Sequence, residues 1–226
     1  AVEYVELGFR FANKNTYMGP CAYTTDLYIN SLKIPKGIKL GIMLNAKDII
    51  SSKMSDKKKI RVFFNNFKNS KISFVRFACH LNEVQKIINI CDQIKKFKIK
   101  VIINLMQISE LSDNDIQNVT KLLNKSKVDV FYFADSLGSL DPKDIVKIIS
   151  NIKLNWKKPL GFHAHDNMGK ALINGITAFN EGASWIDSTV TGMGRGAGNI
   201  KTEYALIEFS KYKKKPKDSS SILKLI

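Results

Sequence analysis

The sequence contains little cysteine, and what it has is not arranged in pairs. Its three cysteines, Cys21, Cys79 and Cys91, form no CxxC motif. An odd number at irregular spacing argues against a disulfide framework and against a cysteine zinc site. Such usage is typical of a reducing compartment, so we expect a cytoplasmic protein.

Long hydrophobic runs are also absent. No stretch approaches the roughly 20 apolar residues that a membrane helix needs, so we expect no membrane association. The first ten residues, AVEYVELGFR, carry two glutamates and alternate like a strand. This pattern differs from that of a signal peptide. Apolar residues at 44% and charged residues at 25% are ordinary for a globular protein.

Negative charge is in short supply, and arginine is scarce among the positive charges. The chain has 36 Lys and Arg against 20 Asp and Glu, a net charge of +16. Nucleic acid is the partner that this balance suggests first. However, only four basic residues are arginines, the side chains that recognise bases and phosphates best. The scattered lysines therefore favour a solvated surface over a nucleic-acid interface.

What the sequence does contain is a regular alternation of strand-like and helix-like runs, spaced about thirty residues apart as in βα units. No linker rich in proline, glycine or serine interrupts it, so we expect one domain over residues 1–226. The expected strands are 2–9, 38–44, 72–78, 99–106, 128–134, 159–165 and 185–191. The expected helices between them include 82–97, 112–127, 141–153 and 171–183. Seven such units fit either a (β/α)8 barrel that lacks one unit or an open doubly wound sheet.

Polar residues collect where these strands end. All three histidines of the chain, His80, His163 and His165, stand at the carboxyl ends of expected strands. The same position on other strands holds Glu6, Arg10, Asp135 and Ser136. Because active sites of barrels and of open α/β sheets lie at this edge, we expect the site there.

The spacing of His163 and His165 predicts a metal site. Residues i and i+2 of a strand point to the same face, so both imidazoles would project together. Two neutral imidazoles suit a divalent metal ion whose shell oxygen ligands complete. The alternative is a pair of strand-end histidines that make only hydrogen bonds.

Two further stretches have less specific interpretations. TGMGRGAGN, residues 191–199, lacks the following βαβ half that a dinucleotide fingerprint needs. A tight loop, a phosphate cradle, or a close backbone approach with Asn199 reaching inward remain open. FYFADSLGSL, residues 131–140, fits a turn and cap, and no base stands beside Ser136 to make it a hydrolase nucleophile.

Three motifs together resemble a known family. They are ADSLG at 134–138, HAHDN at 163–167 and DSTVTGMGRGAGN at 187–199. The family comprises the metal-dependent aldolases, lyases and acyl-transfer synthases related to HMG-CoA lyase, and the chain looks most similar to the 4-hydroxy-2-oxovalerate aldolase-type catalytic domains. The opening VEYVELGFR followed by GPCAYTT supports the resemblance. It implies a (β/α)8 TIM barrel that binds a divalent ion, Mn²⁺ or Mg²⁺, together with a 2-oxo acid.

The resemblance also implies roles for individual residues. His163, His165 and Asn199 match metal ligands of the family. Glu6, His80 and Ser136 match polar residues of the lyase and aldolase sites, and we expect His80 to act as the base. We also expect Arg10 to be catalytic, and Asp135, Gly194 and Arg195 to bind substrate. An arginine side chain can bind a carboxylate or a phosphate with two hydrogen bonds.

The sequence departs from the family at one place. Members begin with a strand that ends in a motif like DxTLRDG, and this chain has no such motif. We therefore expect that it starts at the second barrel strand, about thirty residues short of the family pattern, and that it binds metal weakly. The two sheet edges left open by a missing strand would allow pairing, and a homo-oligomer is one outcome.

The predicted function is a divalent-metal-dependent aldolase or lyase. It would cleave or form a carbon–carbon bond of a 4-hydroxy-2-oxo acid through a pyruvate enolate, with an aldehyde as the second partner. The alternative within enzymes is an acyl-CoA-dependent condensing synthase of the isopropylmalate synthase type. Outside enzymes, the alternatives are a catalytically silent barrel and a basic nucleic-acid-binding domain.

Overall fold

The computed structural model describes residues 2–11, 16–64 and 70–212, which form two compact units. The N-terminal unit comprises Val2–Asn104 and Leu122–Val130. The C-terminal unit comprises Leu105–Lys121 and the described residues from Phe131 onward. Each unit is described by itself below, and the prediction of one domain stays a prediction.

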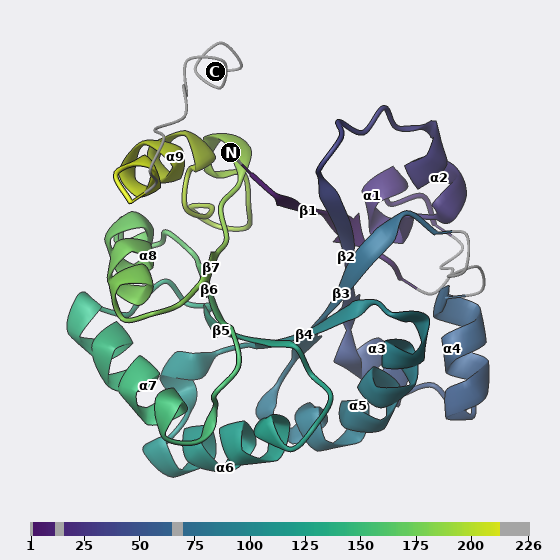
Figure 1. Cartoon of the computed structure of the whole chain (residues 1–226), viewed down its shortest axis with the longest axis horizontal. Coiled ribbons are helices and arrows are strands. Elements are labelled where there is room, and N and C mark those ends of the chain that lie inside the picture. The colour runs from purple at the N-terminus through teal and green to yellow at the C-terminus, as the bar shows by residue number, and fades with distance from the viewer. Residues whose placement is uncertain (1, 12–15, 65–69, 213–226) are drawn as a thin grey trace. The chain divides into compact units, whose positions relative to one another are not determined.

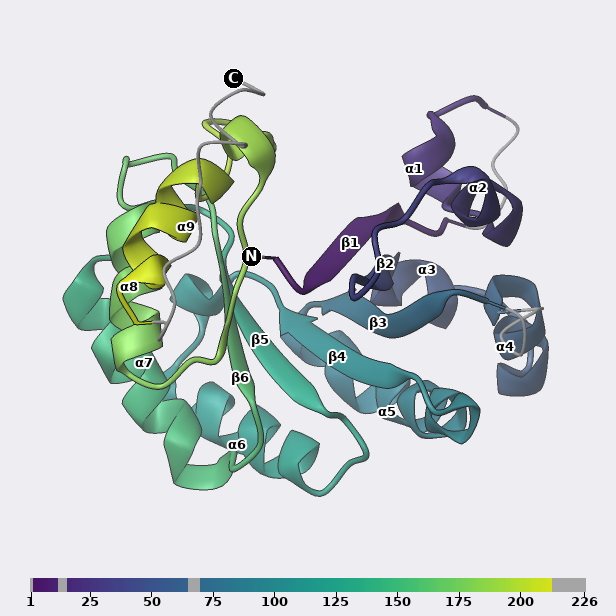
Figure 2. The ribbon, with the colours of Figure 1, turned by 45° about the horizontal axis from the view of Figure 1, so that its top comes forward.

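The N-terminal unit is built on four strands that follow one another in chain order. They are β1 (Tyr4–Phe9), β2 (Lys39–Asn45), β3 (Ile72–Cys79) and β4 (Lys100–Leu105, whose last residue begins the other unit). Its helical elements are α1 (Pro20–Tyr23), α2 (Asp26–Ser31), α3 (Ala46–Ile50), α4 (Asp56–Phe64), α5 (Leu81–Ile94) and the 3₁₀ turn η2 (Lys95–Phe97). β1 pairs with β2 and β2 with β3, both in parallel. Figure 2 shows α5 running beside β3 and β4.

The C-terminal unit repeats the same arrangement with three strands. They are β5 (Val130–Asp135, whose first residue ends the other unit), β6 (Leu160–Ala164) and β7 (Trp185–Ile186), paired in parallel in chain order. The helical elements are η3 (Ile108–Glu110), α6 (Asp113–Asn124, whose residues from Leu122 on belong to the other unit), α7 (Pro142–Asn155), α8 (Ala171–Asn180), η4 (Val190–Gly192) and α9 (Thr202–Ser210). Figure 1 shows α7 and α8 on the same side of β5 and β6.

The expected alternation is confirmed, because all seven expected strands are present, parallel, and separated by helices. Most of the strands are nearly continuous apolar runs because they are buried on both faces. Every residue of β5 is buried, as are seven of the eight residues of β3. Phe77, Phe131, Phe133 and Phe162 are among the largest fully buried side chains.

One expected strand is much shorter than predicted. The run 185–191 forms pairing only over Trp185–Ile186, and Thr189 makes a single bridge to Lys201. Thr191 has φ of 57°, a left-handed conformation that a strand does not allow. The β-branched residues of this run favoured a strand, but the turn into the glycine-rich loop ends it after two residues.

Helix starts follow local chemistry. Asp141 is the N-cap of α7, its backbone amide donates to Asp144, and Pro142 occupies the first turn. Ser112 exchanges hydrogen bonds with Asp115 at the start of α6, in the pattern of a capping box. The short helices α1 to α4 were not predicted, since runs of four to nine residues carry little periodic signal.

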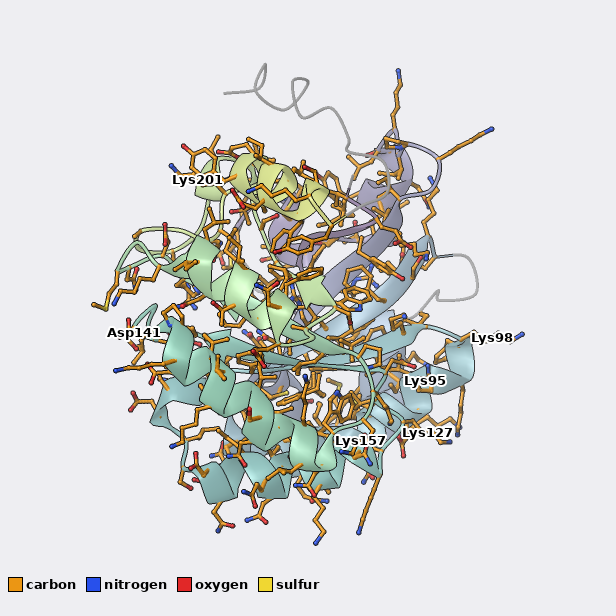
Figure 3. The ribbon with its side chains drawn as sticks, turned by 60° about the vertical axis from the view of Figure 1, so that its left-hand side comes forward. Lys95, Lys98, Lys127, Asp141, Lys157 and Lys201 are labelled. Atoms are coloured by element: carbon orange, nitrogen blue, oxygen red, sulfur yellow. The ribbon has the colours of Figure 1, made fainter. Side chains whose placement is uncertain are left out.

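Many lysines lie at the surface of the described parts of the chain. The side chain of Lys98, for example, projects away from the ribbon in Figure 3. Lys95 instead pairs with Asp129 at 2.8 Å and Lys39 with Glu3 at 2.7 Å, both within the N-terminal unit. Within the described residues, none of the helices is both long and apolar enough to cross a bilayer.

Candidate metal site: two histidines and a glycine-rich loop

His163 lies on β6, one strand away from a carboxylate that orients its ring. The parallel register pairs Phe162 with Ile186, so that the next residues, His163 and Asp187, stand at the same level. Nδ1 of His163 lies 3.0 Å from Oδ2 of Asp187, and each side chain is 21% exposed. Because Nδ1 is committed to this carboxylate, Nε2 is the nitrogen that remains for a ligand.

His165 follows β6 and presents its ring beside that of His163. The ring centroids are 5.2 Å apart and the planes lie at 86° to each other. Burial lowers the pKa of His165, and the charges of His163 and Arg195 lower it further. A hydrogen bond to the backbone of Arg195 acts in the opposite direction. The shift as a whole favours the neutral imidazole, which is the form that binds metal ions.

The glycine-rich loop folds back onto the histidine strand and brings Asn199 with it. His165 and Asn199 form an antiparallel bridge, and the amide of Asp166 donates to the carbonyl of Gly198 at 2.9 Å. Gly198 has φ of 90°, and a Cβ there would lie 2.0 Å from the carbonyl oxygen of Gly192. Only glycine allows this return of the chain.

Asn199 carries a buried oxygen without a hydrogen-bond donor. Its Nδ2 donates to the carbonyl of Met193 at 3.0 Å, and its residue is 8% exposed. Its Oδ1 has no partner among the described residues. A buried amide oxygen that is left unsatisfied costs free energy, and a bound cation would satisfy it.

Asn167 fixes the glycine-rich loop to the loop that follows β5. Its Nδ2 donates to the carbonyl of Leu137 at 2.9 Å, and its Oδ1 accepts from the amide of Ala197 at 3.2 Å. A Cβ at Gly196 would lie 2.8 Å from the same Oδ1. The side chain therefore links two loops on either side of the histidine strand.

Asp135 and Ser136 end β5 and organise its loop. Both carboxylate oxygens of Asp135 accept loop amides, from Ser139 and from Leu140, each at 3.1 Å. The stretch forms the expected turn and cap, and the substrate-binding role predicted for Asp135 stays a prediction. Oγ of Ser136 accepts from the amide of Gln107 at 2.9 Å, and its own proton has no acceptor among the described residues.

Three of the predicted catalytic residues belong to the N-terminal unit. Glu6 pairs with Arg76, with 2.7 Å between Oε2 and Nε, and the side chains are 19% and 7% exposed. His80 precedes α5, where its backbone amide donates to the side chain of Glu83, and its residue is exposed. The roles predicted for Glu6 and His80 stay predictions.

Arg10 is buried and hydrogen-bonded within the N-terminal unit. Its Nε and Nη2 both donate to the carbonyl of Thr24, at 3.1 and 2.7 Å, and Nη1 donates to the carbonyl of Phe63 at 3.2 Å. Nη2 also lies 3.4 Å from Asp26, and the residue is 8% exposed. All three guanidinium nitrogens thus donate to groups of this unit, and the catalytic role predicted for Arg10 stays a prediction.

Two residues that the sequence analysis did not single out are Asp187 and Asn167. Asp187 could have been found, because it follows the strand next to His163 and a histidine metal ligand usually donates its second nitrogen to a carboxylate or carbonyl. Asn167 carries no such signal, since its two contacts depend on how the loops return.

The donor set fits a divalent ion with open coordination positions. Within the described ranges, no group of three or more His, Cys, Asp or Glu side chains could hold a metal. What the C-terminal unit offers is two imidazoles, each with its second nitrogen oriented, and the unsatisfied oxygen of Asn199. Catalytic metal sites keep positions free for substrate and water, so such a partial set is compatible with binding.

The comparisons with known proteins give a consistent similarity. A family model described as HMGL-like matches residues 4–221. The 4-hydroxy-2-oxovalerate aldolase of Geobacillus genomosp. 3 is 31% identical over 144 residues, which are 64% of this chain and 43% of that protein. The enzyme of the same name from Carboxydothermus hydrogenoformans is 38% identical over 91 residues, 40% of this chain and 27% of that protein. The chain thus matches less than half the length of these relatives.

Solved structures agree on the fold. The N-terminal domain of a candidate aldolase from Bacteroides vulgatus is 29% identical, with a TM-score of 0.86 over 98% of this chain and 73% of its own. HMG-CoA lyase of Bacillus subtilis has a TM-score of 0.73 at 13% identity, over 91% of this chain and 74% of its own. These likenesses confirm the predicted barrel fold class.

Proposed function

Because a model of the HMGL-like family matches nearly the whole chain, the chain belongs to that family, and we propose that it acts as a divalent-metal-dependent aldolase or lyase. The substrate class is a 4-hydroxy-2-oxo acid, which yields a 2-oxo acid such as pyruvate and an aldehyde. The relatives that carry the name 4-hydroxy-2-oxovalerate aldolase support this class. The whole activity remains a proposal, because the matches cover less than half of each relative.

The observation that carries the proposal is the buried, unsatisfied oxygen of Asn199, whose backbone bridges to that of His165, together with the two neighbouring imidazoles. In the proposed site, Nε2 of His163, the ring of His165 and Oδ1 of Asn199 hold the ion. Asp187 keeps His163 in the tautomer whose Nε2 lone pair is free. The backbone contact of Arg195 does the same for the ring of His165.

A divalent ion held by these residues would supply Lewis acidity to the oxygens of the bound 2-oxo acid. The residues of the chain bind and orient the 2-oxo acid. Ser136 presents a hydroxyl proton that can donate to a substrate oxygen, since its lone pair already accepts from the amide of Gln107. Asp135 supports this position by holding its loop closed through two amides.

The donor set favours Mn²⁺ over Mg²⁺. Two nitrogen ligands and one amide oxygen form a mixed set, whereas Mg²⁺ prefers oxygen ligands alone. We therefore expect Mn²⁺ to bind more tightly than Mg²⁺ and to support the higher rate.

The test is pyruvate release from 4-hydroxy-2-oxo acids. The 226-residue chain is incubated with Mn²⁺ and the substrate, and pyruvate is measured by coupled reduction to lactate. We expect release that disappears when a chelator is added and returns with Mn²⁺. Release that is unaffected by a chelator, or no release from any 4-hydroxy-2-oxo acid, would contradict the proposal. Release of CoA from acetyl-CoA in the presence of a 2-oxo acid would support a condensing synthase instead.

A further inference from the structure

Arg195 differs from most of the few arginines of this chain in its surroundings. Arg10 and Arg76 are buried and hydrogen-bonded to groups of their own unit. Arg61 lies on the exposed surface of α4. Arg195 is exposed on the glycine-rich loop, and its guanidinium has no hydrogen bond or ion pair among the described residues. An exposed arginine whose backbone contacts His165 is available for a ligand.

The loop that carries Arg195 is fixed to its surroundings at several points. His165 hydrogen-bonds to the backbone of Arg195, and Asn167 accepts from the amide of Ala197 at 3.2 Å. At the other end, Glu203 accepts from the amide of Thr191 at 3.1 Å. Because these contacts hold the backbone, less entropy is lost when a ligand binds to it.

The tip of this loop also offers free backbone donors. The amides of Gly194, Arg195 and Gly196 have no acceptor among the described residues, and all three residues are exposed. Gly196 has φ of 62°, the left-handed conformation found in anion-binding turns made of successive amides. Amides and guanidinium together present only donors and positive charge.

The carboxylates that follow the strands of this unit are engaged elsewhere. Asp135 accepts two loop amides and Asp166 accepts from the amide of Ala171 at 2.8 Å. Asp187 lies against His163. Each of these three carboxylates thus has a partner other than Arg195.

We infer that Arg195 and the amides of Gly194–Gly196 form a subsite for an anionic group, a carboxylate or a phosphate, on the substrate. Guanidinium binds either group with two parallel hydrogen bonds. The inference rests on the proposed function, and it adds that the substrate carries an anionic group on its aldehyde side, separate from the carboxylate of the 2-oxo acid. A 4-hydroxy-2-oxo acid with a neutral alkyl tail would lack the group that this subsite takes.

Direct binding is measured first, without any reaction. The 226-residue chain is titrated with inorganic phosphate and, separately, with acetate, and amide shifts are followed by ¹H–¹⁵N spectra. We expect saturable shifts at Gly194–Gly196, with an affinity that falls about ten-fold or more in Arg195→Ala. The matched control Arg61→Ala should bind as the wild type does. Equal affinity in Arg195→Ala, or shifts confined to other residues, would overturn the inference. If phosphate binds more tightly than acetate, the group is a phosphate. If acetate binds more tightly, the group is a carboxylate.

Substrate preference is measured second. The ratio of kcat/KM for a 4-hydroxy-2-oxo acid with an anionic tail to that for a neutral tail of equal length should favour the anionic tail. This ratio should fall about ten-fold or more in Arg195→Ala and stay constant in Arg61→Ala. If the wild type has the same kcat/KM for both tails, the inferred subsite is overturned, and the proposed function is unaffected. If no tail is cleaved, the proposed function fails, and the phosphate and acetate titrations still decide the subsite.

Discussion

The two units of the chain place polar side chains at the same ends of their strands and use them differently. In the N-terminal unit, Glu6 is paired with Arg76, and Arg10 donates to backbone carbonyls. In the C-terminal unit, His163 and His165 keep ring nitrogens free while their second nitrogens are held. A side chain's position at a strand end therefore indicates where a site can lie. The donors and acceptors that the side chain has not already used in hydrogen bonds indicate what it can do there.

The largest expected effect concerns stability in the N-terminal unit. Glu6→Ala removes the carboxylate that pairs with the buried Arg76, which should lower the free energy of unfolding by about 3 kcal/mol. Urea denaturation measures the change. Glu6→Gln keeps the shape of the side chain and one hydrogen-bond acceptor for Arg76, so it should lower the free energy of unfolding by less. Affinity for Mn²⁺ should not change. Unaltered stability combined with loss of Mn²⁺ binding would show that Glu6 is a ligand and not a structural partner.

The next effect concerns the histidines of the C-terminal unit. His163→Ala combined with His165→Ala should weaken Mn²⁺ binding by about a hundred-fold or more, because removal of ligands exceeds the 10- to 100-fold loss seen for outer-shell partners. Isothermal calorimetry measures the affinity, and circular dichroism checks the fold. The control His80→Ala should bind Mn²⁺ as the wild type does. Full binding by the double variant would exclude this pair as the metal site.

A smaller effect is expected when the orienting carboxylate is removed. Asp187→Asn keeps the volume and lets the ring of His163 change tautomer, so Mn²⁺ affinity should fall about ten-fold or more. Nitrogen-15 spectra of the metal-free protein should show the tautomer change at His163. The matched control Asp113→Asn removes a carboxylate that pairs with Lys147 on the surface of the same unit, and it should have no effect. If Asp187→Asn changes neither the tautomer of His163 nor the affinity for Mn²⁺, Asp187 does not orient the ring of His163.

The smallest effect tests a half-exposed ion pair of the same unit. Lys170 donates to Asp141, and this hydrogen bond lowers the pKa of the Asp141 carboxyl. A lowered pKa stabilises the fold above the ordinary pKa of the group, and the contribution is lost as the pH falls through the lowered value. Asp141→Asn keeps a good N-cap for α7, so the variant should differ little from the wild type at neutral pH. The small difference should vanish at acid pH in thermal melts, and a difference that grows on acidification would reverse the assigned sign.

The sequence was sufficient for the strand and helix order and for part of the candidate site. Buried parallel strands are read from continuous apolar runs, and the i, i+2 spacing of His163 and His165 follows from strand geometry alone. The engagement of Arg10 could not be predicted, because it depends on the carbonyls of Thr24 and Phe63 far along the chain. The link that Asn167 makes between two loops was hidden for the same reason.

The most direct test of the central claim is anomalous scattering from crystals of the chain soaked in Mn²⁺. The account predicts one strong peak bounded by Nε2 of His163, the ring of His165 and Oδ1 of Asn199. Soaking should also leave the contact between His163 and Asp187 in place. No peak at this position, or a strong peak only at another group of residues, would contradict the claim that these three side chains hold the ion.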